Sequence, residues 1–161
     1  LEKFIPPKKG KKHILFIIRE LIEFKPENTK TDLAGALKYL TSAIKKRCTA
    51  FVISDFIDIN DFQTDLTIAN RKHDVVAVQV YDKRETELPP VGLMTIKDAE
   101  TGLERQIDAS SKAVRQAYSL WWANQQNTLA DQFKKSQVDS ISVSTEQDYV
   151  KALINLFHLR S

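Results

Sequence analysis

The sequence predicts an α/β fold with a parallel sheet. Two stretches rich in β-branched apolar residues, 49–54 and 75–81, have the composition of buried strands. A segment with helical spacing, residues 61–71, lies between them, and further helical patterns precede and follow the pair. Helices that alternate with strands along a chain are typical of parallel sheets with helices packed on their faces.

Length and composition restrict the class of protein. The chain has 161 residues, of which 42% are hydrophobic and 28% charged, as expected for one soluble globular domain. Its single cysteine, Cys48, excludes a disulfide framework and a multi-cysteine metal site, and it favours a cytoplasmic setting. The longest apolar run, Ile14–Ile18, is far shorter than the roughly 20 residues of a membrane-spanning helix, so no membrane partner is expected.

The N-terminal half predicts two helices before the first strand. Apolar residues recur at helical spacing between residues 11 and 24, which indicates an amphipathic helix. A second helix is expected to begin at Thr29 or Thr31 as N-cap, with Asp32 in its first turn. The strand at 49–54 is expected to be covered on both faces and to pair in parallel with 75–81, through a crossover that carries the helix near 61–71.

The C-terminal half predicts a hairpin and two more helices. Residues 92–108 are expected to form an appended β-hairpin with Gly102 at a positive φ. The longest helix follows, up to about residue 135, and Trp121 lies on its apolar stripe and is expected to be buried. After a short strand at 141–143, Ser144 and Gln147 have the spacing of a capping box for a final helix.

Basic residues concentrate at the N-terminus. Residues 1–13 hold five lysines and one acid, whereas the rest of the chain holds 19 basic and 20 acidic side chains. A nucleic-acid-binding module using the patch from Lys8 to Lys12 is therefore the alternative function, although nucleic-acid-binding domains usually spread their basic residues over a whole face. Nucleic acid is accordingly the less favoured partner.

Residues that could carry catalysis are scattered. His13, His73 and His158 show no ligand spacing, and each is expected to have a structural role. Cys48 precedes a buried strand and is expected to be a small apolar filler. No Cys–His or Ser–His arrangement is apparent, so we expect a protein that is not an enzyme.

Thr31 and Asp55 are the candidate ligand-binding pair. Asp55 stands at the carboxyl end of the strand 49–54, where ligands bind in open α/β sheets. Thr31 opens the helix that precedes this strand, and a hydroxyl with a carboxylate suits a hard cation such as magnesium. The alternative interpretation is that Thr31 caps a helix and Asp55 opens a turn with Asp58.

Motifs along the whole chain resemble the C-terminal part of the bacterial domain-of-unknown-function family 58. They include Phe4-Ile5-Pro6-Pro7, Thr31-Asp32-Leu33, Ile53-Ser54-Asp55-Phe56, Lys72-His73-Asp74-Val75-Val76 and Thr145-Glu146-Gln147-Asp148-Tyr149-Val150. The resemblance implies a von Willebrand factor A-like, Rossmann-like domain. Residues 1–161 would be its C-terminal portion, a partial parallel sheet without the N-terminal strands. It also implies a non-enzymatic adaptor that works with a MoxR-type AAA+ ATPase in chaperone-like assembly.

The resemblance also bears on metal binding and self-association. Thr31 and Asp55 match two positions of the family's metal-ion-dependent adhesion site, but its Asp-x-Ser-x-Ser segment is absent. The nearest string, Asp108–Lys112, ends in lysine and comes late in the chain. No bound cofactor is therefore expected in this portion, with magnesium a candidate for the full-length protein. Missing strands would leave the edge of residues 50–55 open, so a homodimer through this edge is expected.

Overall fold

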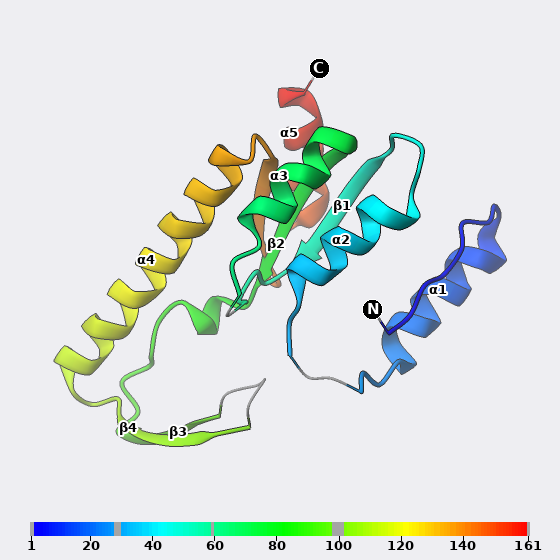
Figure 1. Ribbon diagram of the computed structural model, residues 1–161. Helices are drawn as coiled ribbons and strands as arrows, with labels where there is room; N and C mark the ends of the chain where they lie inside the picture. The colour runs from blue at the N-terminus through cyan, green and yellow to red at the C-terminus, as the bar shows by residue number, and fades with distance from the viewer. Residues whose placement is uncertain (1, 28–29, 59, 98–101, 161) are drawn as a thin grey trace.

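A three-stranded parallel sheet organises the protein (Figure 1). The computed structural model describes residues 2–27, 30–58, 60–97 and 102–160. The strand order is β1-β2-β5, where β1 is Thr49–Ser54, β2 is Asp74–Tyr81 and β5 is Asp139–Ser144. β1 and β2 pair in parallel from Thr49 opposite Asp74 to Ser54 opposite Gln79, which confirms both predicted strands and their pairing.

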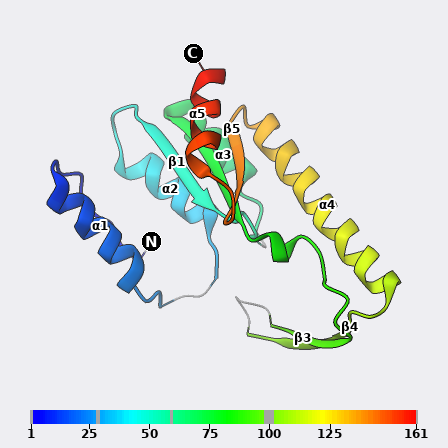
Figure 2. The same cartoon turned by 180° about the vertical axis from the view of Figure 1, so that it is seen from behind.

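Helices lie on both faces of this sheet, as in Rossmann-like folds. The helices α2 (Leu33–Ala43), α3 (Gln63–Lys72) and α4 (Lys112–Lys135) lie on one face. The last helix, α5 (Tyr149–Leu159), packs on the other face, as the view from behind shows (Figure 2). The helix α3 connects β1 to β2, as the sequence predicted.

The central strand β2 supplies both cores because its side chains alternate between the two faces. Val75 and Ala77 belong to the larger core, which side chains of α2, α3 and α4 complete. Val76 and Val78 belong to a smaller core that includes Leu156 of α5. Neighbouring β2 residues therefore point into different cores, and the continuous apolar run of β2 in the sequence follows from this double burial.

The strand β1 is covered on one face only, so the prediction of burial on both faces is wrong. Val52 packs against the larger core, whereas Phe51 and Ile53 point to the other face and are 45% and 69% exposed. On that face α5 lies over β5 and leaves the β1 side open. Composition alone could not show this, because an apolar run is the same whether or not a helix covers it.

The first helix, α1 (Lys11–Glu23), forms as predicted but buries none of its residues. Its Leu21 and Ile22 are each 78% exposed. The helix stands to the side of the sheet, beyond the β1 edge (Figure 1). The preceding segment is anchored to α2 by a ring contact between Phe4 and Tyr39, with centroids 5.9 Å apart.

Two predicted helix caps are replaced by neighbouring aspartates. The N-cap of α2 is Asp32, whose Oδ1 accepts a hydrogen bond from the N–H of Gly35 at 2.8 Å; Thr31 precedes it and Thr29 lies outside the described residues. The N-cap of α5 is Asp148, so the capping box expected at Ser144 is wrong. A carboxylate satisfies free amides as a hydroxyl does and adds a favourable charge at the helix N-terminus.

The predicted hairpin forms, but as a separate two-stranded sheet. Its antiparallel strands are β3 (Leu93–Lys97) and β4 (Glu104–Asp108), and Gly102 has the expected positive φ, at 69°. Residues 98–101 of the expected turn lie outside the described residues. The short helix η1 (Lys83–Glu85) begins the connection from β2, and the N–H of Ala109 donates to the carbonyl of Gly92 at 2.8 Å.

Candidate functional site

A cleft lies where ligands bind in α/β folds, at the carboxyl ends of β1 and β2. Its volume is about 260 Å³, and its walls are the loop that follows β1 and the middle of α4. The lining includes Asp55, Asp58 and Asp61 from the loop, Gln79 from β2, and Trp121, Trp122, Gln125, Gln126 and Gln132 from α4. The carboxylates of the loop therefore lie on one wall of this cleft, and the tryptophans and glutamines of α4 lie on the other.

The three loop aspartates also hold the backbone in its folded path. One carboxylate oxygen of each accepts a hydrogen bond from the backbone N–H two residues ahead, at 3.1 Å for Asp55 and 2.9 Å for Asp58 and Asp61. The other oxygen of Asp58 accepts from the N–H of Leu33 at 2.9 Å and so ties the loop to α2. Much of the acceptor capacity of these carboxylates is thus used within the protein.

Phe56 anchors the same loop from inside. Its φ of 58° is unusual for a residue with a side chain, yet the side chain is 7% exposed. The ring meets Phe133 of α4 edge-on, with centroids 5.0 Å apart, and lies 6.0 Å from Phe62. Burial of this ring offsets the cost of the left-handed backbone and holds Asp55 at the cleft.

Of the predicted pair of Thr31 and Asp55, one residue lines the cleft. Asp55 lines the cleft, whereas Thr31 is half-buried just before α2, beside the Asp58–Leu33 contact. Among the residues that the structure describes, no group of three or more His, Cys, Asp or Glu side chains is placed to hold a metal ion. Asp55 accepts a backbone hydrogen bond within a turn, as in the alternative interpretation, but the helix cap of that interpretation is Asp32 and not Thr31. Metal binding stays a prediction.

The prediction that Trp121 of α4 is buried is wrong. Trp121 is 45% exposed, whereas Trp122 is half-buried and its ring lies 6.2 Å from that of Tyr81. The indole expected in the core is thus the one at the surface, because α4 meets the core mainly through Leu129 and Phe133 near its C-terminal end. The sequence signal for the cleft wall was the adjacent tryptophan pair followed by glutamines.

Gln79 is the buried polar residue at the base of the cleft, 2% exposed. Its side-chain carbonyl accepts a hydrogen bond from the Ser142 hydroxyl at 2.7 Å, and its amide nitrogen donates to the backbone carbonyl of Asp55 at 3.4 Å. These contacts join the ends of all three strands. The sequence signal for this residue is a single polar side chain inside the apolar run of β2, which indicates a buried group with hydrogen-bond partners.

Asp82 carries the strongest electrostatic perturbation at this end of the sheet. It follows β2, and the hydrogen bond from the Arg84 side chain, with that from the Arg84 backbone N–H, lowers its pKa from 3.8 to about 2. Glu85 completes a capping box with Asp82 at the start of η1. This cluster shapes the chain leaving β2 and does not line the cleft.

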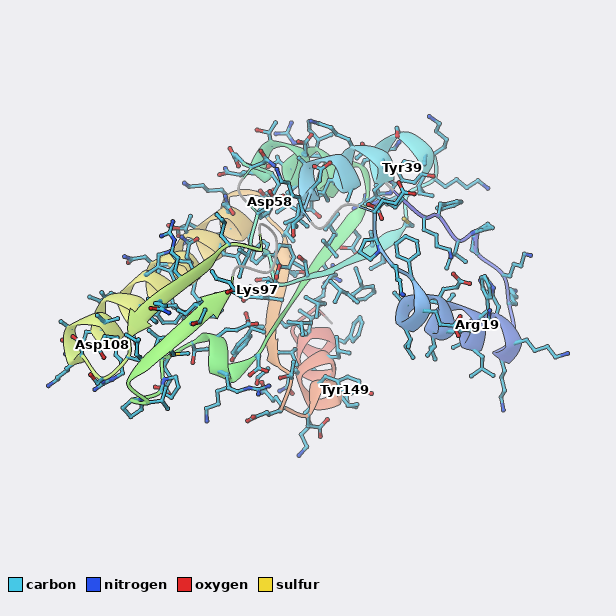
Figure 3. The ribbon with its side chains drawn as sticks, turned by 90° about the horizontal axis from the view of Figure 1, so that it is seen from below. Arg19, Tyr39, Asp58, Lys97, Asp108 and Tyr149 are labelled. Carbon is cyan, nitrogen blue, oxygen red and sulfur yellow. The ribbon has the colours of Figure 1, made fainter. Side chains whose placement is uncertain are left out.

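An apolar groove lies on the opposite face of the sheet. Figure 3 places Asp58 on the α2 side and Tyr149 on α5, with the sheet between them. The groove has a volume of about 620 Å³ between the open face of β1 and α5. Apolar side chains form most of its walls: Phe51, Ile53, Val78, Val80, Val143, Tyr149, Leu153 and Phe157.

The structure brings the thiol of Cys48 into contact with the imidazole of His73, which the sequence did not predict. The Cys48 Sγ lies 3.5 Å from Nδ1 of His73, because the parallel register brings together the residues just before β1 and β2. His73 is fully buried, and its Nε2 has no hydrogen-bond partner within the described part of the chain. An imidazole closed off from solvent fits the structural role expected for this histidine.

The N-terminal lysines gather around a shallow hollow. Lys8, Lys9 and Lys12 line it together with Ile5, Pro6, His13 and Phe16, in a volume of about 560 Å³. No helix in the part of the chain that the structure describes has the length and hydropathy needed to cross a membrane.

Comparison with known proteins decides the family. The model of the family described as protein of unknown function DUF58 matches residues 1–128. The chain belongs to this family. The DUF58 chain is 27% identical over 135 residues to the uncharacterized protein MAV169 of Mycobacterium avium, which covers 84% of this chain and 79% of that protein. No solved structure matches it significantly.

Other mycobacterial relatives are longer. The DUF58 chain is 26% identical over 152 residues to the uncharacterized proteins Mb1516 of Mycobacterium bovis and Rv1480 of Mycobacterium tuberculosis. The match covers 93% of this chain but 48% of each relative. The chain therefore spans about half the length of these two proteins.

Proposed function

We propose that this DUF58 chain is a non-enzymatic protein-interaction module that works with a MoxR-type AAA+ ATPase in chaperone-like assembly in the cytoplasm. The observation that carries the proposal is the apolar groove between β1 and α5. The ATPase as partner comes from the family resemblance in the sequence. A von Willebrand A-like arrangement of the full domain belongs to the same proposal.

The groove suits a polypeptide partner because large apolar side chains stand open along it. Ile53 is 69% exposed, Tyr149 63% and Phe157 48%. Burying apolar surface of this kind stabilises a complex by roughly 25 cal/mol per Å² before the costs of association. The rings of Phe51 and Phe157, which both line the groove, meet edge-on with centroids 6.1 Å apart. We infer that it takes an apolar segment of the ATPase.

The surroundings of Cys48 support a non-enzymatic role. A nucleophile needs a base within reach and space for a substrate beside both groups. The imidazole nearest to the Cys48 thiol, that of His73, is fully buried, so a substrate cannot contact it in this arrangement.

The test measures binding of the purified chain to the MoxR-type ATPase encoded beside its gene, in the ATP-bound and ADP-bound states. We expect Phe157→Ser to weaken binding about tenfold, equivalent to about 1.4 kcal/mol. Leu120→Ser is the matched control, because Leu120 is 65% exposed on α4, away from the groove. No binding by the unmodified chain, or equal losses in the two variants, would overturn the proposal.

Nucleic-acid binding is the second candidate, favoured by the clustering of Lys8, Lys9 and Lys12 in one hollow. Few lysines release few counterions, so the affinity of the chain for duplex DNA should be low and should vanish as salt rises. Fluorescence anisotropy with labelled DNA checks this expectation. Binding that survives about 200 mM salt would put this candidate above the adaptor function.

A further inference from the structure

We infer that the cleft at the carboxyl ends of β1 and β2 binds a neutral saccharide, one sugar ring of which packs on the indole of Trp121. The apolar groove of the ATPase proposal lies on the other face of the sheet, so saccharide binding does not rest on that function. The walls of the cleft come from the loop after β1, from β2 and from α4, so the cleft extends away from the outer edge of β1. Its volume of about 260 Å³ lies below the roughly 300–1,000 Å³ of sites for drug-sized ligands, and it suits a single sugar unit.

Three glutamines of α4 line this cleft without partners of their own. They are Gln125, Gln126 and Gln132, and the last two are half-buried. Within the described residues, none of these three side chains forms a hydrogen bond. An amide that has given up part of its water gains hydrogen bonds when a ligand offers it both an acceptor and a donor. The glutamines are therefore available to a ligand that can donate and accept.

Trp121 offers a fixed aromatic surface beside these amides. Its ring lies 5.5 Å from that of Tyr118 and 6.3 Å from that of Trp122, which in turn lies 6.2 Å from the ring of Tyr81. These contacts hold the indole in place although Trp121 is 45% exposed. A sugar ring presents C–H groups on one face, and these pack on the negative face of an aromatic ring. The indole is thus a platform for a sugar, and its ordering costs little free energy on binding because the neighbouring rings already hold it.

The loop after β1 supplies hydrogen-bond acceptors on the opposite wall. Asp55 and Asp61 are exposed, and each uses one carboxylate oxygen to accept from a backbone N–H of the loop, at 3.1 Å and 2.9 Å. Neither forms an ion pair, and the second oxygen of each has no partner in the part of the chain that the structure describes. An ionised carboxylate only accepts hydrogen bonds, so these two oxygens suit the hydroxyl donors of a ligand.

The combination of carboxylates with amides selects a neutral ligand that carries hydroxyl groups. The described lining holds three aspartates and no Lys, Arg or His, so it repels phosphates and other anions. A cation such as a guanidinium only donates hydrogen bonds, and it would leave the glutamine N–H groups without an acceptor. A sugar hydroxyl both donates and accepts, so the hydroxyls around one sugar ring match the carboxylates of the loop as well as the amides of α4.

Intrinsic fluorescence tests the inference directly, because the chain has two tryptophans and both line this cleft. The purified chain is titrated with glucose, galactose, mannose and N-acetylglucosamine and with their common disaccharides. We expect a saturable change with at least one of these sugars, with a dissociation constant of about 10 mM or lower. Methylguanidinium, inorganic phosphate and triglycine represent a cation, an anion and a peptide, and none should saturate the signal below about 50 mM. No saturation with any sugar, or saturation with one of these three probes instead, would overturn the inference.

Substitutions on α4 show whether the sugar binds in the cleft. Trp121→Ala removes the platform and should weaken binding at least about tenfold, while Trp122 still reports it. Gln126→Ala keeps both indoles, removes one amide and should weaken binding about fivefold. Leu120→Ala is the matched control and should bind like the unmodified chain, because Leu120 is 65% exposed on α4 and lies outside the cleft. Undiminished affinity in the two cleft variants, or an equal loss in Leu120→Ala, would overturn the inference and leave the ATPase proposal untouched.

Discussion

At the scale of single residues, Asp82 shows how a local contact controls a titration. The side chain and backbone N–H of Arg84 donate to its carboxylate and lower its pKa to about 2. Because the folded-state pKa lies below the ordinary 3.8, the ionised carboxylate stabilises the fold fully above about pH 3.8. This contribution is lost as the pH falls through about 2.

We therefore expect Arg84→Ala to raise the pKa of Asp82 from about 2 toward 3.8. The rise should be incomplete, because the backbone N–H of residue 84 still donates to the carboxylate. Titration of the Asp82 carboxyl carbon by NMR measures the change, with Arg71→Ala as a control at an exposed position on α3. An unchanged pKa in Arg84→Ala would contradict this assignment of the cause.

The next prediction concerns magnesium binding at Asp55. Magnesium takes one or two carboxylates together with waters, and Asp55 already gives one oxygen to the N–H of Ile57. A single exposed charge gains little Coulomb energy in water. The chain should thus bind magnesium at millimolar concentrations or more weakly, as isothermal calorimetry would show. A micromolar site that disappears in Asp55→Ala would contradict this, and it would mean that Asp58 or Asp32 completes a centre.

At the scale of elements, the start of α2 shows what an aspartate contributes as a cap. Asp32→Ala leaves the N–H of Gly35 without its acceptor and should lower the free energy of unfolding by about 1 kcal/mol. Asp32→Asn retains an oxygen acceptor and should be nearly neutral. Urea denaturation measures both variants, and Lys30→Ala, at an exposed position two residues earlier, serves as the control. Equal stabilities of the Ala and Asn variants would argue against the cap.

At the scale of the whole molecule, α1 differs from the sheet in burial. It buries no residue, whereas Val76 and Ala77 of β2 are fully buried. Amides of α1 should therefore exchange hydrogen through local opening, and those of β2 only through global unfolding. Hydrogen exchange followed by mass spectrometry should show α1 largely unprotected while β2 stays protected. Equal protection of the two elements would mean that another surface covers α1.

The secondary elements, the parallel pairing of β1 with β2 and the family could all be predicted from the order of the residues. Hydrophobic periodicity is a local property, so the helices at α1 and α3 and the strand 75–81 were predictable from neighbouring residues. At the candidate site, the sequence also predicted that Asp55 follows the end of a strand, because the apolar run of β1 stops directly before it.

The packing of the elements in space determines which apolar residues are covered and which polar groups meet. Phe51 and Ile53 belong to the same apolar run as Val52, yet they stay exposed because α5 packs mainly on β5 and meets Phe51 only at the ring of Phe157. The Cys48–His73 contact and the cleft wall at Trp122 depend on residues far apart in the chain. Burial and long-range contact depend on how elements pack, and a periodic pattern carries no information about its packing partner.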